Sequence, residues 1–413
     1  MSEMQEKSLP LWRNRDYLLL LSGQNISRLG TGISQLAFPL LALTLTRSPV
    51  QATIIGTLAF LPHLAFGLVA GALVDRWNRK HVMIICDLGR AAIFASIAVL
   101  LVLKVFHIPL LYFLVPVDGT LAVFFDLSAT ARLPHVVTRD QLSTAVAQDQ
   151  MALAVTSLLS PFFGGLLYSV AAFCPFLADA LSYLLSAASL CMMNTAFQNV
   201  RNERARPLLL EIRDGLFWLW QQDVLRSLSL LLAAIVFVAS GNSLLVILLA
   251  QSQQASPFAI GLIFTLAGLG GILGSLVAIP IQRRFRFGHI TIAGCWGFVL
   301  CWSLYPLAHV PLAVGAIVAG LSLISIILDV SLISYRLALI PDELRGRISG
   351  ITRLLLMSSR SLGLAVTGLF LQQLGIFPTI AFTWGCLFLA AVGATFSTAL
   401  RRASFPNVHP PKS

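Results

Sequence analysis

The sequence predicts an all-α polytopic membrane protein whose twelve transmembrane helices form two six-helix pseudo-repeats. Of its 413 residues, 57% are hydrophobic and only 11% are charged, whereas an ordinary soluble protein carries about 25% charged residues. The apolar residues lie in runs of the length, about 20 residues, that a helix needs to cross a bilayer. Features of the first half also recur in the second half, at a spacing of about half the chain.

The number and polarity of the apolar runs predict the topology. An even number of spans places both termini on the same side of the membrane. Lys and Arg occur in both tails, and short cytoplasmic segments keep an excess of these residues, so that side is expected to be the cytoplasm. The expected spans are 17–46, 51–75, 80–104, 109–131, 141–169, 172–196, 225–250, 257–282, 288–308, 311–338, 344–373 and 376–400.

These runs divide the chain into two bundles joined by a polar linker. The expected parts are a cytoplasmic N-terminal tail (1–16), an N-terminal six-helix bundle (17–197), a cytoplasmic linker (198–224), a C-terminal six-helix bundle (225–400) and a cytoplasmic C-terminal tail (401–413). Within the linker, Leu208–Gln222 carries large apolar residues at helical spacing with charged residues opposite, which predicts a helix on the inner membrane face. A plain linker is the alternative.

The basic charge of the chain is a signal of topology. The net charge is +11, but most of the 28 Lys and Arg residues fall in the predicted cytoplasmic segments, with Arg47 and Lys104 in outer loops. This bias is typical of a membrane protein and makes nucleic-acid binding unexpected. All six cysteines lie in apolar runs without metal-ligand spacing to histidine, so neither a metal nor a cofactor is expected. The expected location is the inner or plasma membrane.

An internal repeat relates the two halves. Gly71–Val74 corresponds to Gly274–Val277, and basic residues follow both segments. Arg139–Leu142 corresponds to Pro341–Leu344 at nearly the same spacing. Because two separate loops agree, we expect a repeat of six spans. Parallel repeats with a substrate site near the midplane between them are a known transporter architecture.

A compact charged turn separates the second and third predicted spans. The stretch from Gly71 to Lys80 contains one acid, Asp75, among several bases, and the bases mark the cytoplasmic side. The copy in the second half keeps the glycine and the bases but has Ala278 in place of the acid. Topology therefore does not explain Asp75, which we expect to belong to an inner gate. A solvated loop that only follows the charge rule is the alternative.

This turn resembles the loop motif G-x-L-A-D-R-x-G-R-K-x-x-L of the major facilitator superfamily. The matching residues are Gly71, Leu73, Asp75, Arg76, Arg79 and Lys80. The resemblance implies that the positive N-terminal end of the eleventh span faces Asp75. It also implies that Asp126, near the cytoplasmic end of span four, partners Arg76 or Arg79. The cluster would then keep the inner side closed while the transporter is open to the outside.

The fifth span resembles the antiporter pattern g-x-x-x-G-P-x-x-G-G of the same superfamily. The residues at its positions are Thr156, Ser160, Pro161, Gly164 and Gly165, so that two glycines are replaced by small hydroxyl residues. Other segments resemble the bacterial twelve-span efflux branch that includes macrolide exporters, namely Ser27–Gly30, Phe176–Leu184 and Pro341–Arg347. The resemblance implies export of small molecules.

Charged residues inside spans are candidates for a proton or substrate site, because each costs about 2.5–3.5 kcal/mol to insert. The candidates for the cavity are Arg28, Asp118, Asp149 and Arg360. Asp118 lies nearest mid-membrane in span four, and Arg28 is the base expected nearest to it. A buried acid can carry a proton because burial disfavours its charged form, and a basic partner opposes this effect. A static ion pair is the alternative for Asp118.

Other charges in the spans are expected to have mainly local partners. Asp87 and Arg90 are three residues apart on one face of span three, where they can pair. Asp149 and Asp179 are further candidates for the proton. Arg360 either meets an anionic group in the cavity or partners an acid such as Asp329 or Asp149.

These patterns predict a secondary transporter that works by alternating access. None of the lysines (Lys7, Lys80, Lys104 and Lys412) follows a glycine, so the chain lacks the phosphate loop of an ATP-driven pump. The predicted function is proton-coupled export of amphipathic small molecules such as drugs or macrolides, by a monomer in the lipid bilayer. An exporter of an endogenous product such as a siderophore, or an uptake permease, is the alternative. A membrane enzyme or sensor is disfavoured because no His/Asp or Ser/His cluster is visible.

Overall fold

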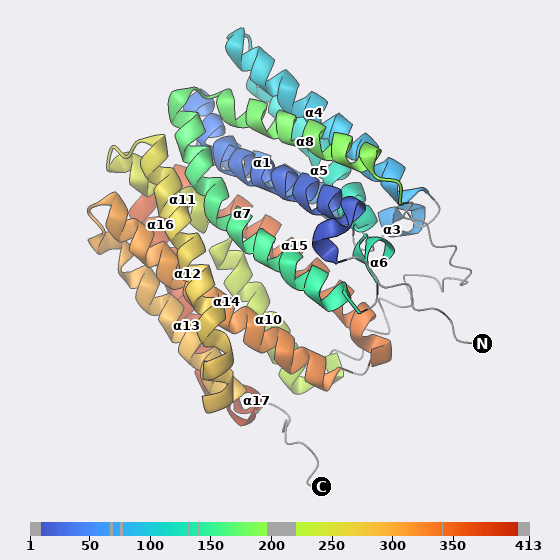
Figure 1. Cartoon of the computed structure of the whole chain (residues 1–413). Coiled ribbons are helices and arrows are strands. Elements are labelled where there is room, and N and C mark those ends of the chain that lie inside the picture. The colour runs from blue at the N-terminus through green and yellow to red at the C-terminus, as the bar shows by residue number, and fades with distance from the viewer. Residues whose placement is uncertain are drawn as a thin grey trace, which may run out of the picture. The chain divides into compact units, whose positions relative to one another are not determined.

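The computed structural model describes residues 10–66, 69–74, 77–129, 132–138, 140–195, 220–340 and 342–403. The regular elements of this part are helices, and twelve helical segments are long and apolar enough to cross a membrane (Figure 1). The predicted fold class is therefore confirmed. The predicted interfacial helix falls largely on residues outside the described ranges and stays a prediction.

The first half of the chain supplies the helices of the first six spans and the short helices before and between them. These are η1 (Leu11–Arg13), α1 (Arg15–Thr46), α2 (Pro49–Phe66), α3 (Val69–Val74), α4 (Arg79–Val102), α5 (Ile108–Ala129), α6 (Leu133–Val136), α7 (Leu142–Val170) and α8 (Cys174–Met192). The start of α4 is fixed by Asn78, whose side-chain oxygen accepts hydrogen bonds from the backbone N–H groups of Lys80 and His81.

The second half supplies the remaining helices. These are α10 (Asp223–Ala239), α11 (Asn242–Ser252), α12 (Pro257–Arg284), α13 (Phe287–Ser303), η2 (Tyr305–Leu307), α14 (Pro311–Leu339), α15 (Asp342–Gln373), α16 (Ile376–Phe396) and α17 (Thr398–Arg402). The predicted span 225–250 is divided between α10 and α11 at Ser240 and Gly241. Gly241 packs directly against the side chain of Thr367 in α15.

The chain folds into two compact units. Unit 1 comprises Met1–Leu41 and Leu58–Asn202, and unit 2 comprises Ala42–Thr57 and Glu203–Ser413. In unit 1, α4 packs mainly against α8 and α5. In unit 2, the principal helix pairs are α12 with α14 and α10 with α15. Each unit thus has its own set of packed helices.

Small residues allow several of these helices to approach closely, as is common in membrane bundles. In unit 1, Gly23 and Gly30 of α1 lie against Ser189 and Ser182 of α8. In unit 2, Gly270 of α12 lies against the Ala319 backbone of α14. A side chain at any of these glycines would meet the neighbouring helix, so the glycines set the distance between helices.

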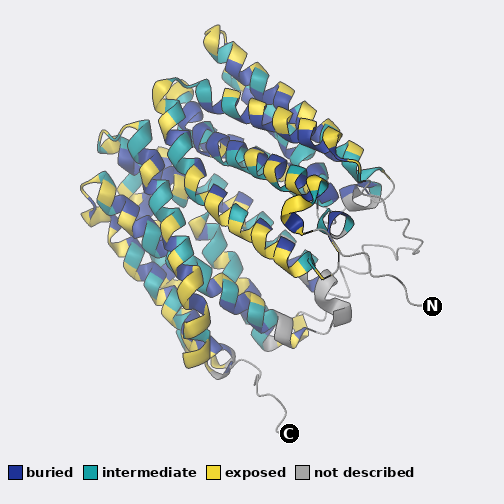
Figure 2. Cartoon of the chain, in the orientation of Figure 1, coloured by how far each residue is buried: buried dark blue, intermediate teal, exposed yellow. Residues whose placement is uncertain are grey.

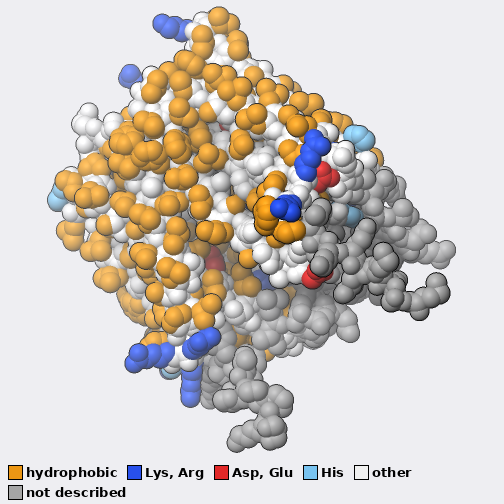
Figure 3. All heavy atoms as spheres, in the orientation of Figure 1, with side chains coloured by type: hydrophobic (Ala, Val, Ile, Leu, Met, Phe, Trp, Pro, Cys, Tyr) orange, Lys and Arg blue, Asp and Glu red, His pale blue; other side chains and the backbone are white. Residues whose placement is uncertain are grey.

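The outward faces of the helices are apolar, as a bilayer requires. Large hydrophobic side chains such as Val170, Leu312, Leu389 and Phe396 are 71–74% exposed. Buried and exposed residues alternate along the helices (Figure 2), and hydrophobic side chains cover much of the described surface in Figure 3. Such a surface is stable in a bilayer, because the lipid tails already shield the exposed apolar side chains from water.

Candidate functional site

An ion-pair cluster in unit 1 joins α1, α7 and the segment before α6. Arg28 of α1 donates to Asp149 of α7 through Nη1 to Oδ1 at 2.9 Å and through Nη2 to Oδ2 at 3.2 Å. Arg132 donates through Nη2 to both oxygens of Asp149, at 3.2 and 3.3 Å. The Asp149 cluster, as we call these three residues, is largely buried, since the Asp149 side chain is only 12% exposed. Bidentate hydrogen bonds between arginine and a carboxylate are strong and directional.

The partner of Arg28 differs from the expectation. Arg28 was expected to lie nearest Asp118, but the structure pairs it with Asp149. Arg132 lies between the predicted spans 109–131 and 141–169, and the sequence does not show that this segment folds back onto α7. Asp126 of α5 lies within electrostatic range of Arg132. Its predicted pairing with Arg76 or Arg79 stays a prediction.

A second ion pair lies between α4 and α5. Arg90 donates through Nε to Asp118 Oδ1 at 2.7 Å and lies over the ring of Tyr183, 4.4 Å from its centroid. The Tyr183 hydroxyl is 2.8 Å from the Thr31 hydroxyl of α1. The expected pairing of Arg90 with Asp87 is therefore wrong, because Arg90 extends towards α5 and Tyr183 whereas Asp87 lies beside Ser186 of α8.

Two further acids in unit 1 are fully buried. Asp87 and Asp179 both have an exposed fraction of 0%. Asp179 is contacted by the hydroxyls of Ser34, at 2.5 Å, and Ser182, at 3.1 Å. Neither oxygen of Asp87 meets the geometry of a hydrogen bond. Of these described acids, Asp118 and Asp149 are therefore paired with arginine, whereas Asp87 and Asp179 have no base in contact.

The charged turn before α4 is only partly described. Asp75 and Arg76 lie outside the described residues, so their part in an inner gate stays a prediction, and Gly71 falls within α3. Lys80 donates through Nζ to the Met193 carbonyl at the end of α8, at 2.5 Å. The Trp77 ring stacks on Phe124, with 6.0 Å between the centroids. The described part of the turn thus connects α4 to α8 and α5.

Asp16, which the sequence did not single out, secures the same end of α8. Its carboxylate accepts hydrogen bonds from the backbone N–H groups of Asn194 and Thr195, at 3.1 and 2.8 Å, and from the Thr195 hydroxyl. Lys80 lies within electrostatic range of this carboxylate. The start of α1 and the start of α4 therefore meet the chain just after α8.

The antiporter-like motif of the fifth span forms the interface between α7 and α1. The Ser160 hydroxyl is 2.6 Å from the Thr156 carbonyl and 3.3 Å from the Leu29 carbonyl. A side chain at Gly164 would lie 3.0 Å from the Ile33 carbonyl, so the absence of a side chain permits this approach. Pro161 and Gly165 lie in the same stretch of α7. The motif therefore packs on the helix that carries Arg28.

In unit 2 the predicted site residue Arg360 lies in α15, where it is exposed. The acid proposed as one of its partners, Asp329 of α14, is exposed as well. Which group Arg360 meets stays a prediction. Among the described residues, no group of three or more His, Cys, Asp or Glu side chains is placed to hold a metal ion.

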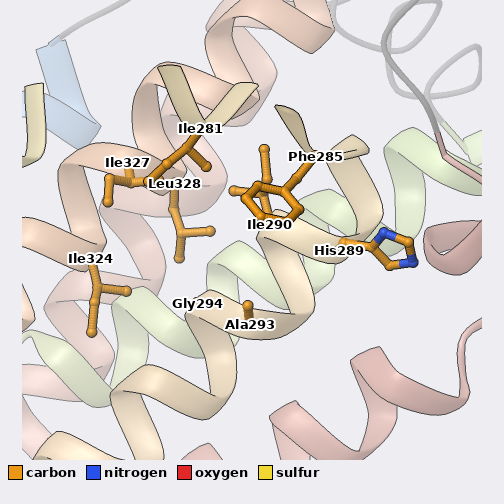
Figure 4. Close-up of a pocket in the computed structure, with 9 residues that line it drawn as sticks. All are labelled: Ile281, Phe285, His289, Ile290, Ala293, Gly294, Ile324, Ile327 and Leu328. Carbon is orange, nitrogen blue, oxygen red and sulfur yellow. The ribbon is translucent and has the colours of Figure 1, made fainter. Parts of the chain in front are cut away.

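Unit 2 also contains a pocket of about 540 Å³ between α12, α13 and α14, which the sequence did not predict. The lining residues, shown in Figure 4, are Ile281, Phe285, His289, Ile290, Ala293, Gly294, Ile324, Ile327 and Leu328. Its walls are almost wholly apolar, with His289 the exception. It suits an apolar group, and its lining offers no acid that could couple transport to a proton.

Comparison with known proteins identifies a matching protein family and several similar transporters. The family model described as Major Facilitator Superfamily matches residues 20–364. Macrolide efflux protein A of Streptococcus pyogenes is 25% identical, covering 88% of this chain and 91% of that protein. The multidrug efflux pump Tap of Mycolicibacterium fortuitum is 26% identical, covering 93% and 96%. The enterobactin exporter EntS of Salmonella typhimurium (strain LT2) is 25% identical, covering 83% and 82%.

The fold is also found among solved structures. The nucleoside transporter NupG has a TM-score of 0.75 to this chain, with coverage of 95% of this chain and 100% of that one. Its sequence identity is only 14%, so the likeness concerns the fold alone.

Proposed function

The chain belongs to the Major Facilitator Superfamily, and from that premise we propose that this secondary transporter exports amphipathic small molecules of the drug or macrolide type in exchange for protons. As a multi-pass membrane protein it moves its substrate by alternating access, with both termini in the cytoplasm. It acts as a monomer and uses the proton gradient as its source of energy.

The observation that carries the proposal is the α1–α7 interface. Tight contacts of small residues, at Gly32 with Ser160 and at Ile33 with Gly164, share this interface with the ion pair between Arg28 and Asp149. Charges inside a membrane bundle are costly and mark ion pathways or substrate sites. An ion pair placed where two helices pack closely can couple the binding of a proton within the same bundle to a movement of one helix on the other.

The direction and the substrate class follow from the motif and the relatives. The fifth-span residues resemble an antiporter pattern, and relatives of nearly full length are named as macrolide and multidrug efflux proteins. An exporter of an endogenous siderophore is the second candidate, because the enterobactin exporter aligns about as well.

Two other groups of residues have roles in this proposal. Asp75, with Gly71, Arg76, Arg79, Lys80 and Asp126, forms the inner gate. Arg28, Asp118, Asp149 and Arg360 line the cavity, where they meet the substrate or respond to the binding of protons.

Everted membrane vesicles test the proposal, because an exporter fills such vesicles from the bath. We expect energised vesicles that contain the protein to accumulate labelled erythromycin, and a protonophore to abolish the accumulation. Vesicles without the protein correct for passive trapping of this weak base. Accumulation that persists after the proton gradient has collapsed would exclude proton coupling. Accumulation of a catecholate siderophore in place of erythromycin would favour the second candidate.

A further inference from the structure

We propose that Asp87 and Asp179 form a proton-binding site inside unit 1, and that this buried site, apart from the Arg90–Asp118 ion pair, holds the coupling protons. The role in coupling rests on the proposed function of proton-driven export, whereas proton binding itself does not. The site lies among α1, α4 and α8 and is distinct from the Asp149 cluster.

The first argument is the balance of charge. Asp87, Asp118 and Asp179 share one base in unit 1, because among the described side chains Arg90 is the base within electrostatic range of Asp87 and Asp179. Arg90 is in contact with Asp118, at 2.7 Å. One base therefore serves three acids. Ionising the other two without partners would leave uncompensated charge away from water, which costs several kcal/mol for each ion.

The second argument is the supply of hydrogen atoms around Asp179. The Ser34 hydroxyl lies 3.0 Å from the Thr31 carbonyl and 2.5 Å from Asp179 Oδ2. The Ser182 hydroxyl lies 2.7 Å from the Asp179 carbonyl and 3.1 Å from Asp179 Oδ1. Each hydroxyl carries one hydrogen. Two hydrogens are therefore available for four acceptor oxygens, namely the Thr31 carbonyl, the Asp179 carbonyl and the two oxygens of the Asp179 carboxylate. A proton on Asp179 supplies a third hydrogen and lets Ser34 bond to the Thr31 carbonyl.

The third argument is the isolation of Asp87. Its side chain is fully buried and neither oxygen has a hydrogen-bond partner. The polar group beside it is the Ser186 hydroxyl, which itself accepts a hydrogen bond from Gln24 at 3.2 Å. A carboxylate that meets no base in contact and at most this one hydroxyl donor is far less stable there than a neutral acid. We therefore assign the protonated form to Asp87.

Within the described part of the chain, the other groups around the site do not supply a second base. The titratable and charged side chains facing Asp87 or Asp179 are Cys86, Arg90, Asp118 and Tyr183. Tyr183 joins the two parts of the site, because its ring lies under the Arg90 guanidinium and its hydroxyl contacts Thr31. Movement of Arg90 from Asp118 towards Asp87 or Asp179 would favour release of a proton, which gives the site a means of responding to a change of state.

Infrared spectroscopy tests proton binding without any substrate, because a protonated carboxyl absorbs separately from a carboxylate. In purified protein at neutral pH we expect the absorbance of protonated carboxyls, with one part lost in Asp87→Asn and another part lost in Asp179→Asn. Asp149→Asn, whose acid is paired with Arg28 and Arg132 away from Arg90, serves as the matched control and should remove none. Absorbance that survives both the Asp87 and the Asp179 substitutions would overturn the assignment.

A less disruptive substitution can still test proton binding by Asp179 if an Asn variant does not fold. Ser34→Ala leaves both acids in place but removes a hydrogen bond to Asp179, so the frequency of the Asp179 carboxyl band should shift. An unshifted spectrum would remove Asp179 from the site.

The coupling role has its own measurement. In liposomes with an acidic lumen, the acceleration of ethidium uptake by the pH gradient should be lost in Asp87→Asn and in Asp179→Asn. Gradient-driven uptake that continues in both variants would overturn their role in coupling. If the wild-type protein itself shows no effect of the gradient, the proposed function fails, and the infrared result still decides whether the two acids bind protons.

Discussion

At the residue scale, two ion pairs between helices hold charged side chains inside the spans of unit 1. The sequence shows that Arg28, Arg90, Asp118 and Asp149 lie within apolar runs. It does not show how each helix is rotated, and rotation decides which neighbour a side chain faces. Arg28 therefore meets Asp149 and Arg90 meets Asp118, against expectation.

The contribution of the buried ion pairs to stability is best tested at the Asp149 cluster, where one acid contacts two arginines. A single interhelical hydrogen bond in a membrane protein contributes about 0.6 kcal/mol on average. We expect a contribution of this size from the 2.8 Å hydrogen bond between Tyr305 and Asn242. Removing one member of a buried ion pair costs about 3–5 kcal/mol, because the remaining charge loses its partner. The Arg28 side chain remains 25% exposed, so the effect here should fall below that range.

Asp149→Asn should destabilise unit 1 by about 2 kcal/mol, because Arg28 and Arg132 then face each other without a negative charge between them. Thermal unfolding of the purified protein in detergent measures this effect. Asp140→Asn, at an exposed position in the turn before α7, is the matched control and should leave the melting temperature unchanged. Equal melting temperatures for the two variants would show that the cluster contributes little to stability.

At the element scale, hydropathy predicted the spans because a helix in lipid must be apolar over its whole length. The limits are close to those observed, for example α7 at Leu142–Val170 against an expected 141–169. Hydropathy could not show the break between α10 and α11, because Ser240 and Gly241 occur within a continuous apolar run. At that break Gly241 lies close to Thr367 of α15, and a continuous run of apolar letters does not reveal such a contact.

Close packing at Gly270 gives a prediction at this scale. Gly270→Ala should lower the stability of unit 2, because the added methyl would collide with the Ala319 backbone and separate α12 from α14. The cost should be about 1–3 kcal/mol, although alanine favours a helix over glycine by about 1 kcal/mol. Thermal unfolding of the purified protein is the measurement.

The control for this substitution is Gly385→Ala in α16. No atom lies within 4 Å of the position that its added methyl would occupy. This variant should be as stable as the wild type or slightly more stable. If both alanine variants behave alike, the contact between α12 and α14 is not held by Gly270.

At the scale of the whole molecule, the asymmetry of charge is the main finding. Unit 1 holds the Asp149 cluster, the Arg90–Asp118 pair and the two buried acids, whereas the described pocket of unit 2 is lined almost wholly by apolar side chains. The internal repeat predicted similar halves, but sequence similarity at two loops says little about the chemistry within each bundle. Under the proposed function, the acids of unit 1 would carry the protons, and the apolar pocket of unit 2 would offer surface to an apolar group.

The central claim is exchange of an amphipathic molecule for protons, and purified protein in liposomes tests it most directly. Ethidium is a suitable probe because its permanent positive charge prevents trapping by protonation. With the lumen more acidic than the bath, the account predicts ethidium uptake several times faster than at equal pH, accompanied by alkalinisation of the lumen, and neither change in protein-free liposomes. Equal rates with and without the gradient, or uptake without movement of protons, would contradict it.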